Sequence, residues 1–245
     1  MVEWIEAAWD APSHVRVITT VRSSGVSQGP YHAGNMALHV GDDPEAVLVN
    51  RASLASQLDH TQPLVWMNQT HSVDVISVDG PEQDPLECDA CVTRERDLPL
   101  CVMTADCLPV VITDEAGAVV AAVHAGWRGL LNGIIQNTVD EMGAPANTLL
   151  AWIGPGISQS VYEVDQSVWR AFQGFSSNWE QCFQPASRQG HFLCSLPGLA
   201  ADWMKDKGMQ VYQSNLCTLT DPRFFSYRQQ TPTGRMATVV WGASE

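Results

Sequence analysis

The chain has 245 residues, of which 45% are hydrophobic and 16% charged, so it can bury a sizeable core without disulfide staples. Its 27 acidic residues outnumber its 13 Lys and Arg residues and give a formal net charge of -14. A strongly acidic surface repels phosphate backbones and anionic lipids. This charge excludes nucleic acid and membrane surfaces as expected partners and leaves a small-molecule substrate.

The amino-terminal segment has neither the basic nor the apolar region of a secretory signal, and no apolar run approaches the length of a membrane span. Seven cysteines, an odd number spread through the chain, are typical of a reducing compartment. We therefore expect a cytoplasmic protein. No linker, repeat or low-complexity segment interrupts residues 1–245, which predicts one domain, and no pattern indicates an oligomeric state.

The first part of the chain predicts a strand, a loop and a capped helix. Residues 15–21 are rich in β-branched side chains and are typical of a strand, and a loop rich in Gly and Ser follows. Asp43 is a favourable N-cap and Pro44 fits the first helical position, so a helix should begin there. Arg51 falls on the apolar stripe of this helix. It either meets an anion or carboxylate, or lies along the core with its charged end in solvent.

Two strand-like runs, residues 64–67 and 73–78, flank His71. A histidine alone between strands is usually a hydrogen-bonded structural residue. His71 by itself therefore does not indicate a functional site, and other ligand or catalytic residues must lie near it. Cys88 and Cys91 form a CxxC pair, but no second pair at zinc-ribbon spacing follows. We expect these two cysteines to lie in the core.

The central stretch, residues 100–135, predicts the functional centre. Residues 108–113 and 118–123 are apolar runs joined by a turn sequence, so they should form an antiparallel hairpin. Cys107 precedes the first run and His124 follows the second, which places both at the same end of the hairpin. Asp106, beside Cys107, is expected to act as an acid/base or orienting group.

After His124, residues 125–129 form a glycine-flanked turn that leads into an amphipathic helix reaching Met142. The free backbone N–H groups of this turn, together with Arg128, indicate an anion or oxyanion site. Later elements are expected as follows: strands at 148–153 and 209–213, helices at 165–175 and 196–207, and two strands around Thr-Pro-Thr-Gly within 224–241.

We interpret His71, Cys107 and His124 as residues that converge on one site. Two imidazole nitrogens and one thiolate with an open fourth position are typical of catalytic Zn²⁺, which activates water near neutral pH. Without a metal, Cys107 and His124 would suit a cysteine hydrolase. Cu²⁺ would also bind such ligands tightly, but the seven histidines form no His-x-His pair, which argues against a multicopper oxidase mechanism.

Six blocks spread over nearly the whole chain carry a family resemblance: NMALHVGDDPEAVLVNR, WMNQTHSVDV, CVMTADCLPVVI, VAAVHAGWRGLLNGI, WIGPGIS and FFSYRQQTPTGRMA. They resemble the YfiH-type laccase-domain family, also called multicopper polyphenol oxidase-like or purine nucleoside phosphorylase proteins. The resemblance implies an α/β (α+β) fold, a single domain with mixed sheets layered between helices. It also implies similarity to the catalytic domain of the cytotoxic necrotizing factor toxins.

The resemblance further implies Zn²⁺ held by His71, Cys107 and His124, with Cu²⁺ as a possible substitute. The implied activities are phosphorolysis of adenosine, inosine and methylthioadenosine, and hydrolytic deamination of adenosine, with a purine nucleoside and phosphate as substrates. Some members are named polyphenol oxidases or peptidoglycan editing factors. A laccase-like oxidase, a zinc or cysteine amidohydrolase acting on a peptidoglycan precursor, and a non-enzymatic binding protein therefore stay as alternatives.

Position in the shared motifs suggests further roles. Arg51 and Arg128 would supply the anion site that phosphorolysis needs, and Asn35 and Gln69 are expected substrate contacts. The chain departs from the family pattern at two places: Cys194 stands where an aspartate is usual, and FFSYRQQ replaces FFSYRRD. Neither departure touches the three expected metal ligands.

Overall fold

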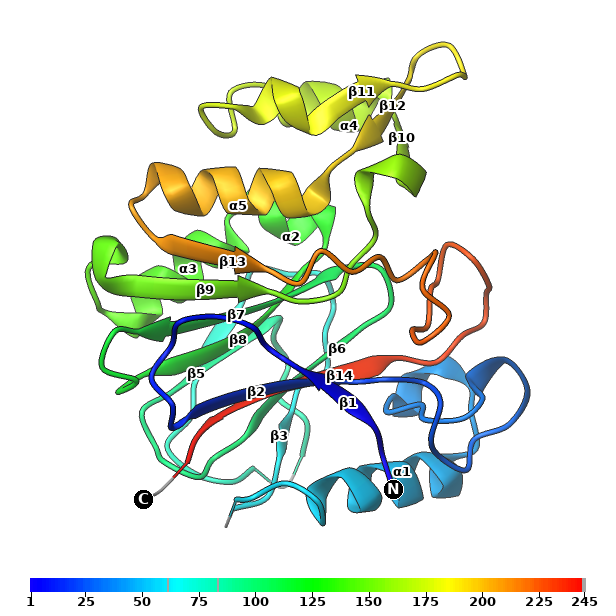
Figure 1. Cartoon of the computed structure of the whole chain (residues 1–245), viewed down its shortest axis with the longest axis vertical. Helices are drawn as coiled ribbons and strands as arrows, with labels where there is room; N and C mark the ends of the chain where they lie inside the picture. Colours follow the sequence, from blue (N-terminus) through cyan, green and yellow to red (C-terminus); the bar gives the residue numbers. More distant parts are fainter. Residues whose placement is uncertain (61, 83, 244–245) are drawn as a thin grey trace.

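A computed structural model describes residues 1–60, 62–82 and 84–243 of the chain (Figure 1). Two mixed β-sheets lie against each other, and helices cover their outer faces. The predicted mixed α/β fold is confirmed, whereas the likeness to the toxin domain stays a prediction. No helix among the described residues has the length and apolar character needed to cross a bilayer.

The first sheet has five strands, in the order β1 (Trp4–Glu6), β2 (Val15–Thr20), β14 (Met236–Gly242), β6 (Leu100–Thr104) and β3 (Val65–Trp66). Neighbouring strands are antiparallel except β3, which runs parallel to β6. Helix α1 (Pro44–Ala55) packs on the outer face of this sheet (Figure 1). The predicted start of α1 is confirmed, since the Asp43 side chain accepts a hydrogen bond from the backbone N–H of Glu45.

The second sheet has six strands, in the order β13 (Gln210–Gln213), β9 (Leu149–Ile153), β7 (Leu108–Asp114), β8 (Val120–Ala125), β5 (Ala90–Thr93) and β4 (Val75–Ser77). The pairs at its two edges are parallel and the three central pairs are antiparallel. Its outer face is covered by α2 (Trp127–Asn132), α3 (Ile134–Met142) and α5 (Leu196–Asp206) (Figure 1).

A small antiparallel sheet lies beyond α5, in the order β10 (Glu163–Asp165), β12 (His191–Cys194) and β11 (Phe183–Pro185), with α4 (Gln166–Ala171) beside it (Figure 1). Short 3-10 helices occur at Gly29–Tyr31, Leu38–Val40, Ala146–Thr148, Gln159–Val161 and Trp179–Cys182.

Strand alternation divides the core into layers. On β7, Val111 faces the core between the two large sheets, while Val110 and Ile112 face the helices on the other side. On β14, Val240 faces the inter-sheet core and Val239 faces the layer that contains α1. Because both faces of these strands are buried, their sequences are continuous apolar runs.

Two expected elements are wrong. The single helix expected after His124 is divided into α2 and α3 at Gly133, which has the left-handed φ of 99°. The expected first strand of the carboxyl-terminal pair is a loop at residues 224–235. Phe224 and Phe225 are buried in it, but its backbone bonds to other loops instead of a neighbouring strand.

Candidate metal centre

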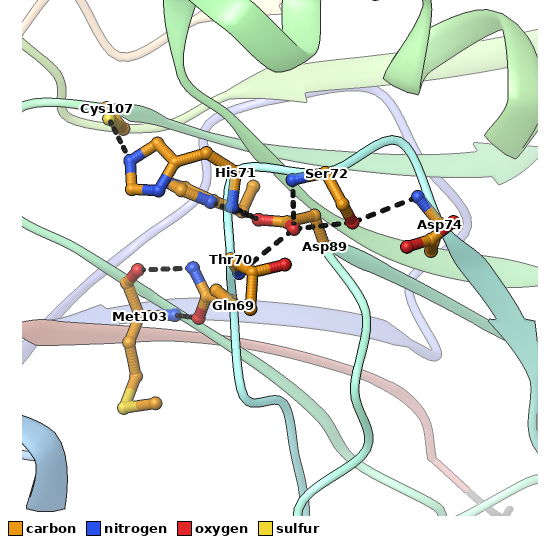
Figure 2. A network of polar contacts seen from close by, with 9 residues as sticks. Gln69, Thr70, His71, Ser72, Asp74, Asp89, Met103 and Cys107 are labelled. Atoms are coloured by element: carbon orange, nitrogen blue, oxygen red, sulfur yellow. Dashed lines mark hydrogen bonds and ion pairs between the residues drawn. The ribbon is translucent and has the colours of Figure 1, made fainter.

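His71, Cys107 and His124 come together at one end of the second sheet. Their ligand atoms all lie within 4.8 Å of one another, and the Cys107 Sγ atom is 3.8 Å from Nε2 of His71. The two imidazole rings meet edge to face with centroids 4.7 Å apart. Figure 2 shows the Cys107 sulfur facing the His71 ring. The expected convergence of the three residues is therefore present in the structure.

The local fold explains this convergence. In the β7–β8 hairpin Leu108 pairs with Ala125, so Cys107 and His124 lie at the same open end, as the turn sequence predicts. His71 reaches them from the loop between β3 and β4, where its φ is 62°. Gly126 leaves room for them: a Cβ atom there would lie 3.1 Å from both the Cys107 Sγ and Cδ2 of His71.

Asp89 holds two of the three residues in place. Its buried carboxylate accepts a hydrogen bond from Nδ1 of His124 at 2.7 Å, which leaves Nε2 for the centre. The same carboxylate accepts the backbone N–H groups of Thr70, His71 and Ser72 and the Ser72 hydroxyl (Figure 2). Sequence reasoning missed Asp89, although it stands between the two cysteines of the CxxC pair.

Electrostatics favour a cation at this centre. Burial opposes ionisation of Cys107, but the charge and hydrogen bond of His124, together with His71, lower the pKa of the thiol to about 6. Burial opposes protonation of His124, yet Cys107 and Asp89 raise the pKa of its imidazole to about 9. Burial likewise opposes ionisation of Asp89, but His124 and Ser72 lower the pKa of that carboxyl to about 2. In the metal-free centre the Cys107 thiol and the Asp89 carboxyl are thus shifted toward their anionic forms and the His124 imidazole toward its protonated form, and a bound metal would replace that proton.

The donor set fits a catalytic metal. Two imidazole nitrogens and a thiolate are ligands that Zn²⁺ prefers, and they also suit copper. Within the described part of the chain, no fourth His, Cys or carboxylate joins the cluster. The nearby Asp106 carboxylate is occupied, since it accepts hydrogen bonds from the Thr218 hydroxyl and the backbone N–H of Arg228, both at 2.7 Å. One coordination position would stay open to substrate or water.

The centre opens into a cavity of about 510 Å³. It is lined by His39, Gln69, His71, Met103, Thr104, Ala105, Asp106, Cys107, His124, Trp127, Arg128, Ile157, Tyr162, Leu196, Tyr227, Arg228 and Arg235. A cavity of this size falls within the usual range for small-ligand sites. Aromatic and apolar side chains share the lining with arginines, as in many small-ligand sites where a few polar groups fix the ligand.

Asn35 and Arg51, expected to contact substrate, do not line this cavity. Asn35 is fully buried, and its side chain bonds to the Asp42 carboxylate and to backbone groups of Ala37 and Arg235. Arg51 lies with its guanidinium 3.7 Å above the Trp66 ring and donates to the Met36 carbonyl. An aromatic face and a carbonyl satisfy Arg51, in place of the expected anion.

The other expected contacts do line the cavity. Gln69 uses both ends of its amide on the backbone of Met103, with two hydrogen bonds of 2.8 Å (Figure 2). These two bonds fix the Gln69 side chain to the cavity wall, so its amide has fewer hydrogen-bonding groups free for a substrate. Arg128 is exposed, and its guanidinium lies 4.4 Å above the Trp127 ring. The anion site expected at the turn before α2 stays a prediction.

Sequence reasoning missed several lining residues: His39, Tyr162, Tyr227, Arg228 and Arg235. Tyr227, Arg228 and Arg235 belong to the block FFSYRQQTPTGRMA, so the signal was present in the sequence. The expected pair of strands would have placed alternate residues of this block on opposite faces of a sheet. The loop at 224–235 instead brings all three to the cavity.

The chain matches known proteins over nearly its full length. The family model described as multi-copper polyphenol oxidoreductase laccase matches residues 16–243. A purine nucleoside phosphorylase of Pseudomonas aeruginosa is 39% identical over 98% of this chain and 99% of its own. A purine nucleoside phosphorylase of Haemophilus influenzae is also 39% identical, over 97% of this chain and 98% of its own.

A crystal structure of a Neisseria meningitidis protein superposes with a TM-score of 0.93 at 40% identity, covering 98% of this chain and 99% of that one. Both the sequence and the fold are thus shared over nearly the full length. The chain belongs to the YfiH-type laccase-domain family, alongside relatives named purine nucleoside phosphorylase.

Proposed function

We propose that the chain is a zinc-dependent enzyme of purine nucleosides. It catalyses phosphorolysis of adenosine, inosine and methylthioadenosine, and hydrolytic deamination of adenosine. The observation that carries this proposal is the convergence of His71, Cys107 and His124 at a cavity large enough for a nucleoside. The names of the Pseudomonas and Haemophilus relatives support the purine nucleoside substrate and the phosphorolysis reaction.

His71, Cys107 and His124 would hold the metal, which supplies Lewis acidity in the cavity when it is bound. Asp89 keeps Nδ1 of His124 engaged, so that Nε2 faces the centre. The planar purine has aromatic partners in the cavity wall, Trp127 and Tyr162 among them. The arginines that line the same cavity would meet the anionic co-substrate.

Turnover assays on the purified protein test this proposal. Wild type should release the free purine from adenosine and inosine only when phosphate is present, with formation of ribose 1-phosphate. Activity should fall on chelation and return with Zn²⁺. Reconstitution with Cu²⁺, followed by phenol oxidation assays, tests the laccase-like alternative. Purine release that survives complete metal removal would contradict the proposal.

One observation favours a second candidate, a cysteine hydrolase. The pKa of the Cys107 thiol is lowered to about 6 by His124 and His71, which gives a nucleophilic thiolate at neutral pH. A cysteine hydrolase would keep its activity in chelators and lose it on alkylation of Cys107. The proposed metalloenzyme would lose activity in both treatments, so the chelator result separates the two candidates.

A further inference from the structure

Positive charge is concentrated in the cavity. The chain has 13 Lys and Arg residues and a net charge of -14, yet three arginines line this one cavity: Arg128, Arg228 and Arg235. The only carboxylate among the described lining residues is that of Asp106, which is held by Thr218 and by the Arg228 backbone. The cavity therefore carries the opposite charge to the protein as a whole, which favours an anionic ligand.

Arg235 is a partly buried cation without a carboxylate partner. No carboxylate lies within ion-pair distance of it in the described ranges. Nη1 donates to the carbonyl oxygens of Thr233 and Gly234, and the guanidinium lies 5.6 Å from the centroid of the Tyr227 ring. These side-chain hydrogen bonds use Nη1 alone, so the edge formed by Nε and Nη2 remains available. Such an edge binds an oxyanion through two parallel hydrogen bonds.

Hydrogen bonds from neighbouring segments anchor the backbones of Arg235 and Arg228 and one nitrogen of the Arg228 side chain. The Asn35 side chain accepts the backbone N–H of Arg235 at 2.9 Å, and the backbone N–H of Met36 donates to the Arg235 carbonyl. Asp106 accepts the backbone N–H of Arg228, whose Nη1 donates to the Glu163 carbonyl. A preorganised pair of cations gives a ligand more affinity than two mobile side chains do.

The arginine pair lies beside the metal centre. Asp106, which anchors Arg228, is the direct neighbour of Cys107 in the chain. Arg235 is close enough to both Asp106 and Cys107 for their charges to act on its guanidinium. An oxyanion held by these arginines would therefore lie next to whatever the three-residue centre binds.

We propose that Arg235 and Arg228 form an oxyanion subsite for a phosphate group, with Arg235 as its main ligand. The inference rests on the proposed function, because phosphorolysis requires bound phosphate. In that reaction a phosphate oxygen forms a bond to C1′ of the ribose while the glycosidic C–N bond breaks. The electron pair of that bond leaves with the purine, which takes up the proton of hydrogen phosphate. The same two arginines would also bind the 5′-phosphate of a nucleotide.

Calorimetric titration of the holoenzyme with inorganic phosphate tests the subsite directly. The set comprises wild type, Arg235→Met, Arg228→Met and the control Arg223→Met. Arg223 belongs to the same segment, but it pairs with Asp221 and does not line the cavity. We expect the dissociation constant to rise about tenfold or more in Arg235→Met and several-fold in Arg228→Met. Arg223→Met should match wild type, and Arg235→Lys should recover part of the loss.

Equal phosphate affinity in wild type and Arg235→Met, or no phosphate binding by wild type at millimolar concentration, would overturn the subsite. If Arg235→Met does not fold, Arg228→Met decides the question, because Arg228 is exposed and its replacement disturbs the core less. Unchanged phosphate affinity in a folded Arg228→Met protein would then count against the proposal.

Titration with adenosine and adenosine 5′-monophosphate identifies the source of the phosphate. Free phosphate as the ligand predicts a raised phosphate KM in Arg235→Met with little change in the adenosine KM. Tighter binding of the monophosphate than of adenosine, lost in Arg235→Met, would keep the subsite and make the nucleotide its ligand.

The same variants separate the subsite from the proposed function. Phosphate binding that depends on Arg235, without any phosphorolysis, would sustain the subsite and contradict the proposed function. Phosphorolysis with an unchanged phosphate KM in both variants would contradict the subsite alone.

Discussion

Oδ1 of Asp89 lies 2.7 Å from Nδ1 of His124, and the Asp89 carboxylate also accepts the backbone N–H of His71. One buried carboxylate thus orients the ring of one candidate ligand and the backbone of another. A third residue, Cys107, completes the centre from the neighbouring strand connection. The geometry of the site therefore depends on Asp89 as much as on the residues that would touch a metal.

Replacing Asp89 by Asn should weaken metal binding by about 10- to 100-fold, because the carboxylate that fixes the His124 ring loses its charge. Competition with a chromophoric zinc chelator measures this change. Asp165→Asn is a matched control, because Asp165 caps α4 and does not line the cavity. Equal zinc affinity in Asp89→Asn and wild type would show that the Asp89–His124 hydrogen bond does not tune the centre.

Gly126→Ala should reduce metal occupancy while the fold persists. The backbone of Gly126 has a φ of -70°, which alanine adopts readily, so strain comes only from the new Cβ atom. That atom would lie 3.1 Å from both the Cys107 Sγ and Cδ2 of His71 and would displace one of them. Gly80→Ala provides the control, because a Cβ there meets nothing within 4 Å. Full zinc content in Gly126→Ala would contradict this expectation.

In the metal-free protein, alkylation of Cys107 should follow an apparent pKa of about 6, below the ordinary thiol value, because His124 and His71 outweigh burial. The thiolate is the reactive form, so the alkylation rate should climb as pH rises through 6 and level off above it. Mass spectrometry after timed exposure to iodoacetamide measures the rate. His124→Ala should move the midpoint upward, and a midpoint that stays near 6 in this variant would refute His124 as the cause.

Asn35→Ala should lower the free energy of unfolding by about 1–3 kcal/mol, because it leaves buried backbone groups of Ala37 and Arg235 without partners. Urea denaturation measures this loss. A residue that only contacts substrate would change KM and leave stability intact. Wild-type stability together with a raised nucleoside KM would therefore restore the original expectation for Asn35 as a substrate contact.

Sequence patterns predict the parts of the site that local chemistry determines. The turn at 114–117 between two apolar runs is enough to place Cys107 and His124 together, and Asp43 with Pro44 defines the start of α1. The same reasoning cannot find Asp89, because its partners lie 17 to 35 residues away along the chain. Its importance becomes visible only when β5 pairs with β8.

The carboxyl-terminal loop shows a second limit of sequence patterns. Residues 224–241 have a pattern that is typical of two strands. In the first part, however, the backbone N–H of Arg228 bonds to the Asp106 carboxylate, and the Arg235 carbonyl accepts the backbone N–H of Met36. Tertiary hydrogen bonds override the local strand preference there. As a result, Arg228 and Arg235 reach the cavity, while Arg51, which position in the shared motifs suggested as a phosphate contact, stacks on Trp66 outside it.

The most direct test of the central claim is the metal content of the protein, purified without added metal and determined by elemental analysis. Wild type, Cys107→Ala and the control Cys217→Ala should be compared, with adenosine-plus-phosphate turnover measured on the same samples. We predict about one zinc per chain in wild type and Cys217→Ala, and loss of both zinc and purine release in Cys107→Ala. Zinc retained in Cys107→Ala, or turnover that does not follow zinc content, would contradict a catalytic centre formed by His71, Cys107 and His124.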